Sequence, residues 1–309
     1  MSTNRYQGVD PVLTTAAIGY TNGSMIAELL FPSIKVKQQS GKHWIYDKGR
    51  FRVNKNGRAA GANSQEVTLN LTTGKPYFCE DHALKQFVLD EDVKNAMEPE
   101  KPFIDATENV TDMHLVAREV ELAATLTSTS VLTQNVTLSG TDQFNDAGSD
   151  PIGVLSDAMS AIHSNTFLTA NTAVIPKQVF DVMKNHAAFI ERIKYSQKGI
   201  VTAELIAEVL GVERVIIATA GKNTAKEGQT DTMGYVWGKD IILAYIAPKI
   251  EQKMLTLGLT YTWQEMQVER LRGVDEEDRK GTYVRVGNHY YDQNLVSAEC
   301  GYLIKNAIA

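Results

Sequence analysis

The sequence DATENVTDMHLVAREVELAATLTS, residues 105–128, predicts the longest regular element of this chain. Its apolar residues recur at the three- and four-residue steps of one helix face: Val110, Met113, Ala117, Val120 and Ala124. Asp105 and Glu108 have the spacing of a capping box at the start of a helix. We therefore predict a helix from about residue 106 to residue 128, which would be about 35 Å long.

A long hairpin is predicted upstream of this helix. Apolar and polar residues alternate over residues 50–54 and again over 66–71, with the period of two that is typical of strands. The residues between them include Asn56-Gly57 and Gly61, so they predict a polar turn region. A lone two-stranded ribbon is marginally stable in water. The hairpin therefore needs a surface, from its own domain or from a neighbouring subunit.

The flanking regions predict an α+β fold. Residues 1–37 show little periodicity beyond a short helix near Met25–Leu30, so we expect an arm that packs on another surface. Asp150-Pro151 predicts a helix start, and Thr202 and Gly211 predict the two ends of another helix. A third helix is predicted over residues 176–186. Strands are predicted over residues 173–175, 214–218, 257–263, 268–271 and 283–286.

Charge is unevenly distributed around the hairpin. Residues 38–58 contain a single acid, Asp47, and six basic residues: Lys42, Lys48, Arg50, Arg52, Lys55 and Arg58. Residues 59–125 contain thirteen acids, among them Asp112, Glu119 and Glu121, and five basic residues. These runs are typical of solvated faces. The alternative is a basic ribbon that docks on an acidic partner surface.

The composition is that of a soluble globular protein. The 309 residues suffice for two domains or one elaborated domain, and 43% are hydrophobic and 22% charged. The longest apolar run, Ile241–Ala247, is too short to span a membrane, and no secretory signal is recognisable, so we expect a cytoplasmic protein. The net charge of -6 argues against binding nucleic acid over the whole surface, although a protein that merely encloses nucleic acid could be acidic.

No motif in the sequence predicts catalysis. Cys79 and His82 form one close pair of possible zinc ligands, and His289 and Cys300 would have to complete the site from a distance. Gly221-Lys-Asn-Thr lacks the first glycine of a phosphate-binding loop. We therefore predict no catalytic residue, no metal site, no cofactor and no enzymatic activity. An α+β enzyme with an unrecognised site is the alternative from another class.

Several segments, in this order, carry a resemblance to a known family: Asp10–Thr15, Ala17–Tyr20, Asn22–Ala27, Asp105–Asp112, Leu138–Phe144, Glu191–Tyr195 with Gly199–Thr202, and Gly238–Tyr245. In these segments the chain resembles the major capsid proteins of tailed bacteriophages with the Hong Kong 97 fold. None of the segments is a chemical motif, so the specificity comes from their order and co-occurrence.

The resemblance implies a division of the chain into four parts. Residues 1–37 would be the N-terminal arm, and residues 38–80 an extended hairpin loop that reaches over an adjacent subunit. Residues 81–150 and 256–309 would form the peripheral domain, with the helix of residues 106–128 as its spine. Residues 151–255 would form the axial domain, which contacts its copies around the symmetry axes.

The resemblance also implies a function and partners. The chain would be a major capsid protein whose hexamers and pentamers build an icosahedral shell around double-stranded DNA in the virion. Assembly would take place in the host cytoplasm, with a separate scaffolding protein, a portal and, as a further candidate, a decoration protein. A nanocompartment shell with protein cargo is the alternative of the same fold. The long helix and hairpin argue against a tail tube or decoration protein.

The candidate site residues are contacts between subunits. We expect the basic hairpin to dock on acids of the spine, and the mixed-charge turn at residues 275–280 to lie, by analogy with the family, near a threefold contact. The residues concerned are Lys48, Arg50, Arg52, Lys55, Arg58, Asp112, Glu119, Glu121, Asp275, Glu276, Glu277, Asp278, Arg279 and Lys280.

Overall fold

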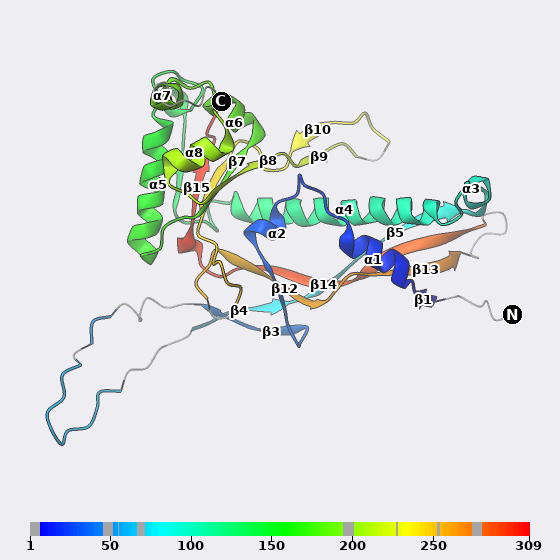
Figure 1. Ribbon diagram of the computed structural model, residues 1–309, viewed down its shortest axis with the longest axis horizontal. Helices are drawn as coiled ribbons and strands as arrows, with labels where there is room; N and C mark the ends of the chain where they lie inside the picture. The colour runs from blue at the N-terminus through cyan, green and yellow to red at the C-terminus, as the bar shows by residue number, and fades with distance from the viewer. Residues whose placement is uncertain are drawn as a thin grey trace.

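The described part of the computed structural model contains two large sheets, one beside a long helix and one among shorter helices, and two two-stranded sheets (Figure 1). Within the described residues, no helix is long and apolar enough to cross a bilayer. The residues that the structure describes are 7–45, 52–54, 56–66, 72–193, 201–226, 228–251, 254–273 and 280–309.

The six-stranded sheet is built around one long strand, β14. This strand pairs with three others, all antiparallel, and only the β12–β2 pair of the sheet is parallel. The members of the sheet are β1 (Gln7–Val9), β13 (Gln267–Gly273), β14 (Gly281–Leu295), β12 (Gly258–Gln264), β2 (Ser33–Lys35) and β5 (Glu80–Leu89).

Helix α4 (Lys101–Leu126) lies along one face of this sheet (Figure 1). Phe103, Ala106 and Val110 of α4 share a buried apolar cluster with Val284 and Val286 of β14. The short helix α3 (Asp90–Asn95) leads from β5 toward it. The predicted long helix is confirmed. Its predicted start is wrong, because α4 already begins at Lys101 and no side chain caps it.

The five-stranded sheet has the order β6-β15-β11-β7-β8. All residues of β7 and β11 are buried, as expected for central strands covered on both faces. The strands are β6 (Asn135–Thr137), β15 (Gly301–Lys305), β11 (Ile241–Ala244), β7 (Thr172–Pro176) and β8 (Arg214–Ala218). The helices around them are α5 (Pro151–Thr166), α6 (Lys177–Met183), α7 (Ala187–Ile193) and α8 (Ala203–Leu210).

The predicted ends of two of these helices are confirmed. The Asp150 carboxylate accepts a hydrogen bond from the Gly153 N–H at 3.0 Å at the start of α5. The Thr202 hydroxyl accepts one from the Leu205 N–H at 3.3 Å at the start of α8. Helix α8 ends at Leu210 and is followed by Gly211, whose φ of 71° is the left-handed conformation that glycine favours.

The arm is part of the six-stranded sheet rather than a separate tail. Strands β1 and β2 occupy positions at the ends of the strand order, next to β13 and β12. Helix α2 (Ala27–Leu30) confirms the predicted short helix. Sequence analysis does not predict α1 (Pro11–Gly19), although the Asp10 carboxylate caps it by accepting from the Val12 N–H at 2.9 Å and the Leu13 N–H at 3.1 Å.

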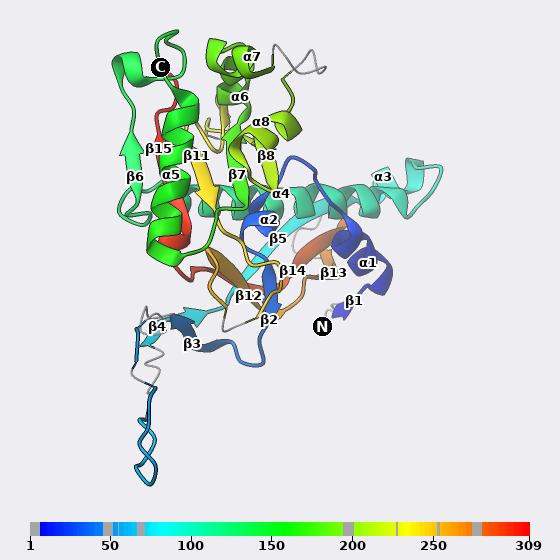
Figure 2. The same cartoon turned by 60° about the vertical axis from the view of Figure 1, so that its left-hand side comes forward.

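The two strands of the hairpin pair nearer to the large sheets than the sequence predicts. Its strands are β3 (Ser40–Ile45) and β4 (Thr72–Phe78), which are antiparallel. Residues 52–54 and 56–66 are described without regular structure, so the strand predicted over residues 50–54 is wrong where it can be compared. Its partner, predicted over residues 66–71, lies outside the described residues except for Glu66. Figure 2 shows the loop extending well beyond both sheets.

The sheets do not follow the expected domain boundaries. Strands β6 and β15 fall in the residues assigned to the peripheral domain, yet both hydrogen-bond within the five-stranded sheet. The register aligns Ile241 of β11 with Ile304 of β15, and the side chains of this pair contribute to that sheet's core. The division into peripheral and axial domains therefore stays a prediction that would need these segments reassigned.

Candidate functional site

The carboxylate of Glu119 joins three parts of the chain in the protein interior. Its Oε2 accepts hydrogen bonds from the backbone N–H groups of Ile26 at 2.9 Å and Ala27 at 2.7 Å. Its Oε1 accepts one from Nε1 of Trp237 at 2.6 Å. Burial raises the pKa of Glu119, whereas these three donors and the nearby Arg118 lower it. We call Glu119, Ile26, Ala27 and Trp237 the Glu119 joint.

The expectation that Glu119 contacts another subunit is wrong. Its exposed fraction is 0%, and both carboxylate oxygens are already engaged inside the chain. Asp112 is half-buried and accepts a hydrogen bond from Asn22 Nδ2 at 2.7 Å, so it too contacts the arm. Of the three spine acids among the candidates, Glu121 is the one that is exposed.

A second polar cluster lies where α4 crosses β14 and β5. The ring of Tyr291 stacks on His82 with centroids 4.0 Å apart and lies 4.8 Å from the ring of His289. The guanidinium of Arg118 is 5.6 Å from the Tyr291 centroid. Burial, and then the charges of Arg118, His114 and His82, lower the pKa of His289 to about 3. We call these five side chains, three of them imidazoles, the histidine cluster.

Arg270 of β13 holds the start of the arm against the start of α4. Its Nε lies 2.7 Å from a carboxylate oxygen of Asp10, and its other end pairs with Glu100. The guanidinium also lies 4.4 Å from the ring centroid of Phe103. The residues that fix the arm, Arg270, Asn22 and Trp237, were missed by sequence analysis. Only Asp10, followed by a proline at the first turn of α1, gave a readable signal.

The basic loop is exposed where the structure describes it. Arg52 and Arg58 are solvent-exposed, and Arg58 Nη1 donates a hydrogen bond to the carbonyl of Ala62 at 2.8 Å. Lys48, Arg50 and Lys55 lie outside the described residues. These two arginines are therefore placed away from the acids of their own α4 and available to another molecule.

The mixed-charge turn is described only at its last residue. Lys280 is exposed, and its carbonyl accepts a hydrogen bond from the Asp90 N–H at 3.2 Å. Asp275, Glu276, Glu277, Asp278 and Arg279 lie outside the described residues. Their expected contact near a threefold axis stays a prediction.

Of the four residues considered for a zinc site, His82 and His289 both contact the ring of Tyr291, whereas the two cysteines are buried in other clusters. Cys79 and Cys300 are buried in two different apolar clusters, and burial raises their thiol pKa values to about 11 and about 12. Residues 221–223 of the loop-like motif form strand β9 (Gly221–Asn223), paired with β10 (Met233–Tyr235). Among the described residues, no three His, Cys, Asp or Glu side chains are grouped so as to hold a metal ion.

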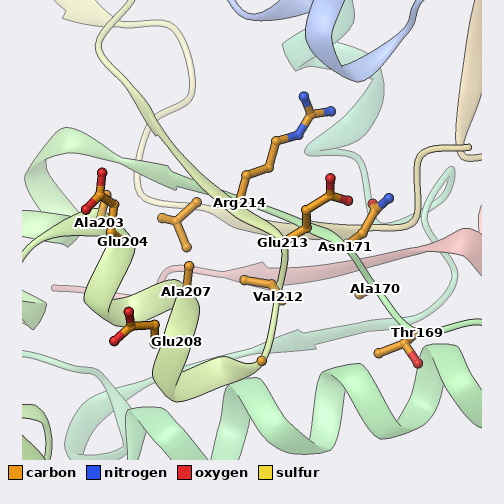
Figure 3. Close-up of a pocket in the computed structure, with 12 residues that line it drawn as sticks. Thr169, Ala170, Asn171, Ala203, Glu204, Ala207, Glu208, Val212, Glu213 and Arg214 are labelled. Carbon is orange, nitrogen blue, oxygen red and sulfur yellow. The ribbon is translucent and has the colours of Figure 1, made fainter. Parts of the chain in front are cut away.

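A cavity of about 670 Å³ lies between α8 and the start of β8. Figure 3 shows Glu204 and Glu208 on α8, separated by apolar side chains from Glu213 and Arg214. The Arg214 guanidinium donates hydrogen bonds to Thr172 Oγ1 at 3.0 Å and to the carbonyl of Leu29 at 3.3 Å. The charged groups thus do not converge on one point, and the arginine already has protein partners.

Comparisons with known proteins point to one class. No family model matches the chain. It is 34% identical to the major capsid protein of Burkholderia phage BcepMu over 240 residues, which are 77% of this chain and 76% of that protein. It is 30% identical to the major capsid protein of Pseudomonas phage JBD67, over 97% of each chain.

Solved structures share the fold. A phage-related protein from Bordetella bronchiseptica has a TM-score of 0.78 and 26% identity, with 97% of this chain and 98% of that chain covered. The capsid structure of cyanophage P-SCSP1u has a TM-score of 0.60 and 10% identity, with coverage of 89% and 85%. The second of these supports the architecture alone.

Proposed function

The chain belongs to the family of bacteriophage major capsid proteins and has the Hong Kong 97-type fold, and we propose that it builds an icosahedral shell from hexamers and pentamers around double-stranded DNA. The observation that carries this proposal is the alignment with a phage major capsid protein over 97% of both chains. The role that we infer is structural rather than catalytic.

The extended loop supports self-association. Arg52 and Arg58 lie on a segment that projects from the body and has no regular structure where it is described. A projecting basic segment gains little from its own chain, but it can engage an acidic surface of a neighbour. We propose that it docks on an adjacent subunit, where many identical weak contacts act together in a closed shell.

The proposal extends to partners and place. Packaged DNA favours a wall that repels phosphate, and the net charge of -6 suits such a wall. We propose assembly in the host cytoplasm with a separate scaffolding protein and a portal, and a decoration protein as an additional partner. A shell of the same fold that holds protein cargo is the competing function.

Negative-stain electron microscopy of the purified protein tests shell formation. We expect closed shells or sheets of capsomers when the chain is expressed with the neighbouring phage genes. Nuclease treatment and nucleic-acid staining of shells from infected cells then identify the content. Shells filled with protein and free of DNA would favour the nanocompartment function. Uniform small particles under every condition would contradict both.

The double variant Arg52→Glu/Arg58→Glu tests the docking of the loop. Both side chains are exposed, so reversal should leave the unfolding midpoint unchanged while it reduces the yield of shells about tenfold or more, because each contact is repeated in every subunit. Arg52→Lys/Arg58→Lys retains the charge and is the matched control. Normal shells from the glutamate variant would exclude an electrostatic role of these arginines.

A further inference from the structure

The dipeptide Asn-Gly occurs twice in the chain, at Asn22-Gly23 in the arm and at Asn56-Gly57 in the extended loop. Asparagine is chemically labile before glycine, because glycine has no side chain to keep its backbone nitrogen away from the carboxamide carbon of the asparagine. The two dipeptides have the same covalent structure. Their surroundings in the folded chain therefore decide which of them reacts.

The folded chain fixes the side chain of Asn22. Its Nδ2 donates a hydrogen bond to Asp112 at 2.7 Å, and its Oδ1 accepts from the N–H of Ser24 at 3.0 Å and from the Ser24 hydroxyl at 2.6 Å. These bonds restrict the rotation that would bring Cγ of Asn22 to the nitrogen of Gly23. A carboxylate at position 22 would also lie beside that of Asp112, and like charges at this distance are unfavourable. The fold thus protects Asn22.

The side chain of Asn56 is free of such restraints. Asn56 and Gly57 are solvent-exposed and belong to the loop that extends beyond both sheets (Figure 2). None of the residues that the structure describes forms a hydrogen bond with Asn56. A Cβ atom added at Gly57 would meet nothing within 4 Å, so the space around the backbone nitrogen is open. The amide of Asn56 can therefore reach the Gly57 nitrogen by simple rotation.

Asn63 separates the effect of exposure from the effect of glycine. It is exposed on the same loop, and no described residue forms a hydrogen bond with it. Its successor is Ser64, whose side chain hinders the approach of the backbone nitrogen to the amide carbon. Asn22 has the glycine without the exposure, and Asn63 has the exposure without the glycine. Of these three asparagines, Asn56 is the one that combines both.

We propose that Asn56 is a site of spontaneous deamidation and that the modified loop docks less well on a neighbouring subunit. The second half of this inference rests on the proposed shell function, and the first half does not. Free subunits would then lose the ability to assemble as they age. Subunits already in a shell would react more slowly, because the docked loop is covered.

The reaction needs water but no enzyme, oxidant or reductant. The deprotonated backbone nitrogen of Gly57 forms a bond to Cγ of Asn56, the Cγ–Nδ2 bond breaks, and Nδ2 leaves as ammonia with the proton from Gly57. Water then opens the cyclic imide. Opening at Cγ yields aspartate, and opening at the main-chain carbonyl yields isoaspartate. Overall a water molecule is consumed, ammonia is released, and a neutral amide becomes a carboxylate.

Both products change the loop in a way that opposes docking. Residues 52–58 contain Arg52, Lys55 and Arg58 and no acid, so the new carboxylate introduces a negative charge among three basic residues. Isoaspartate also inserts Cβ into the backbone, which changes the spacing of Arg52 and Arg58. Docking on an acidic surface depends on the number and the positions of the positive charges. Deamidation of Asn56 should therefore weaken it.

Mass spectrometry of the full chain, incubated in neutral buffer, tests the modification site. Cleavage after Glu28 and Glu66 separates Asn22 from Asn56 and Asn63. Each conversion adds about 1 Da. We expect deamidation at Asn56 to be at least about tenfold faster than at Asn22 or Asn63, and Gly57→Ala to slow it by about the same factor. In guanidinium chloride, which unfolds the chain, Asn22 and Asn56 should react at similar rates.

Shell yield tests the consequence for assembly. Asn56→Asp introduces the charge of the product, and Asn56→Gln retains an amide that would have to form a larger ring to react. We expect the shell yield of Asn56→Asp to be at least about threefold below that of Asn56→Gln, with equal unfolding midpoints. Stored wild-type protein should lose shell yield in step with the fraction of Asn56 converted, whereas stored Asn56→Gln should keep its initial yield.

The outcomes separate this inference from the shell function. Equal deamidation of Asn22 and Asn56 in the folded chain, or of Asn63 and Asn56, would overturn the modification site. Equal shell yields of Asn56→Asp and Asn56→Gln would overturn the effect on docking while the shell function stands. Failure of fresh wild-type protein to form shells would overturn the shell function and the effect on docking together, and the deamidation rates would still decide the site.

Discussion

The two halves of the molecule are held together by different physics. The five-stranded sheet and its helices enclose a large cluster of aliphatic and aromatic side chains, and His186 is a buried ionisable side chain nearby. Helix α4 instead buries His114, Arg118 and Glu119 against the six-stranded sheet, the arm and Trp237. An apolar core is set by residue volume, whereas a buried polar joint depends on the position of every donor. The second arrangement specifies where the arm must lie.

Removing the Glu119 carboxylate should have the largest effect. Glu119→Ala leaves the N–H groups of Ile26 and Ala27 and the indole of Trp237 buried without an acceptor, so we expect a loss of about 4 kcal/mol in the free energy of unfolding. Urea denaturation followed by circular dichroism measures it. Glu121→Ala, two residues along and exposed, should change stability by less than about 0.5 kcal/mol. Equal effects of the two variants would contradict a stabilising role of the Glu119 hydrogen bonds.

A cavity in the core of the five-stranded sheet should lower the free energy of unfolding somewhat less, and its effect on hydrogen exchange should stay near the cavity. Leu155 of α5 has no exposed surface, and Leu155→Ala should destabilise by about 3 kcal/mol through lost packing. Hydrogen exchange should then accelerate in α5 and β7 more than in α1 and α2, whereas Glu119→Ala should accelerate exchange in the arm helices. If both variants accelerate exchange in the same segments, the two halves unfold as one cooperative unit and do not differ in local stability.

Lowering the pH should reduce the free energy of unfolding by a smaller amount, through the histidine cluster on the six-stranded sheet. The pKa of His289 is about 3 in the folded chain and about 6.5 when unfolded, so the unfolded state binds more protons between these values. Stability is therefore complete above about pH 6.5 and falls as the pH decreases, by about 2 kcal/mol at pH 5. The raised pKa of Glu119 acts oppositely, because it favours the folded state as the pH falls.

The variant His289→Leu isolates the histidine from the other titrating groups. Its unfolding free energy should change less between pH 7 and pH 5 than that of the wild type, while His163→Gln on the exposed side of α5 should keep the wild-type slope. Thermal or urea unfolding at several pH values provides the comparison. An unchanged slope in His289→Leu would mean that His289 does not cause the pH dependence of stability in this range.

The contrast between the halves also explains what could be predicted from the sequence. The elements of the five-stranded half could be predicted because their sequence signals are local. Asp150 and Thr202 cap their helices, and β7 and β8 are short apolar runs between turn residues. The long helix was readable for the same reason. Its start was misplaced because Asp105 and Glu108 suggested a cap, whereas α4 begins without one.

The buried polar contacts of α4 could not be predicted because their partners lie far away in the sequence. Glu119 looks like one more acid of a charged helix, and its partners stand 93, 92 and 118 residues away in the sequence. No periodicity identifies such a partner. The strands of the hairpin were misplaced because the alternation of apolar and polar residues continues into the loop, where no described residue pairs with residues 52–54. Helix α1 was missed although Asp10-Pro11 repeats the start signal of α5.

Strands β14 and β15 have a consequence for synthesis on the ribosome. Both lie late in the sequence, and both are interior to their sheets: β14 pairs with β5, β12 and β13, and β15 pairs with β6 and β11. The register of β14 with β5 joins residues about 200 positions apart, such as Lys85 and Arg285. The six-stranded sheet therefore cannot close before residue 295 has been translated, and the five-stranded sheet cannot close before residue 305. Long-range pairing of this kind is slow. A chain truncated before β14 would lack an interior strand of each sheet, and we expect that it could not join a shell.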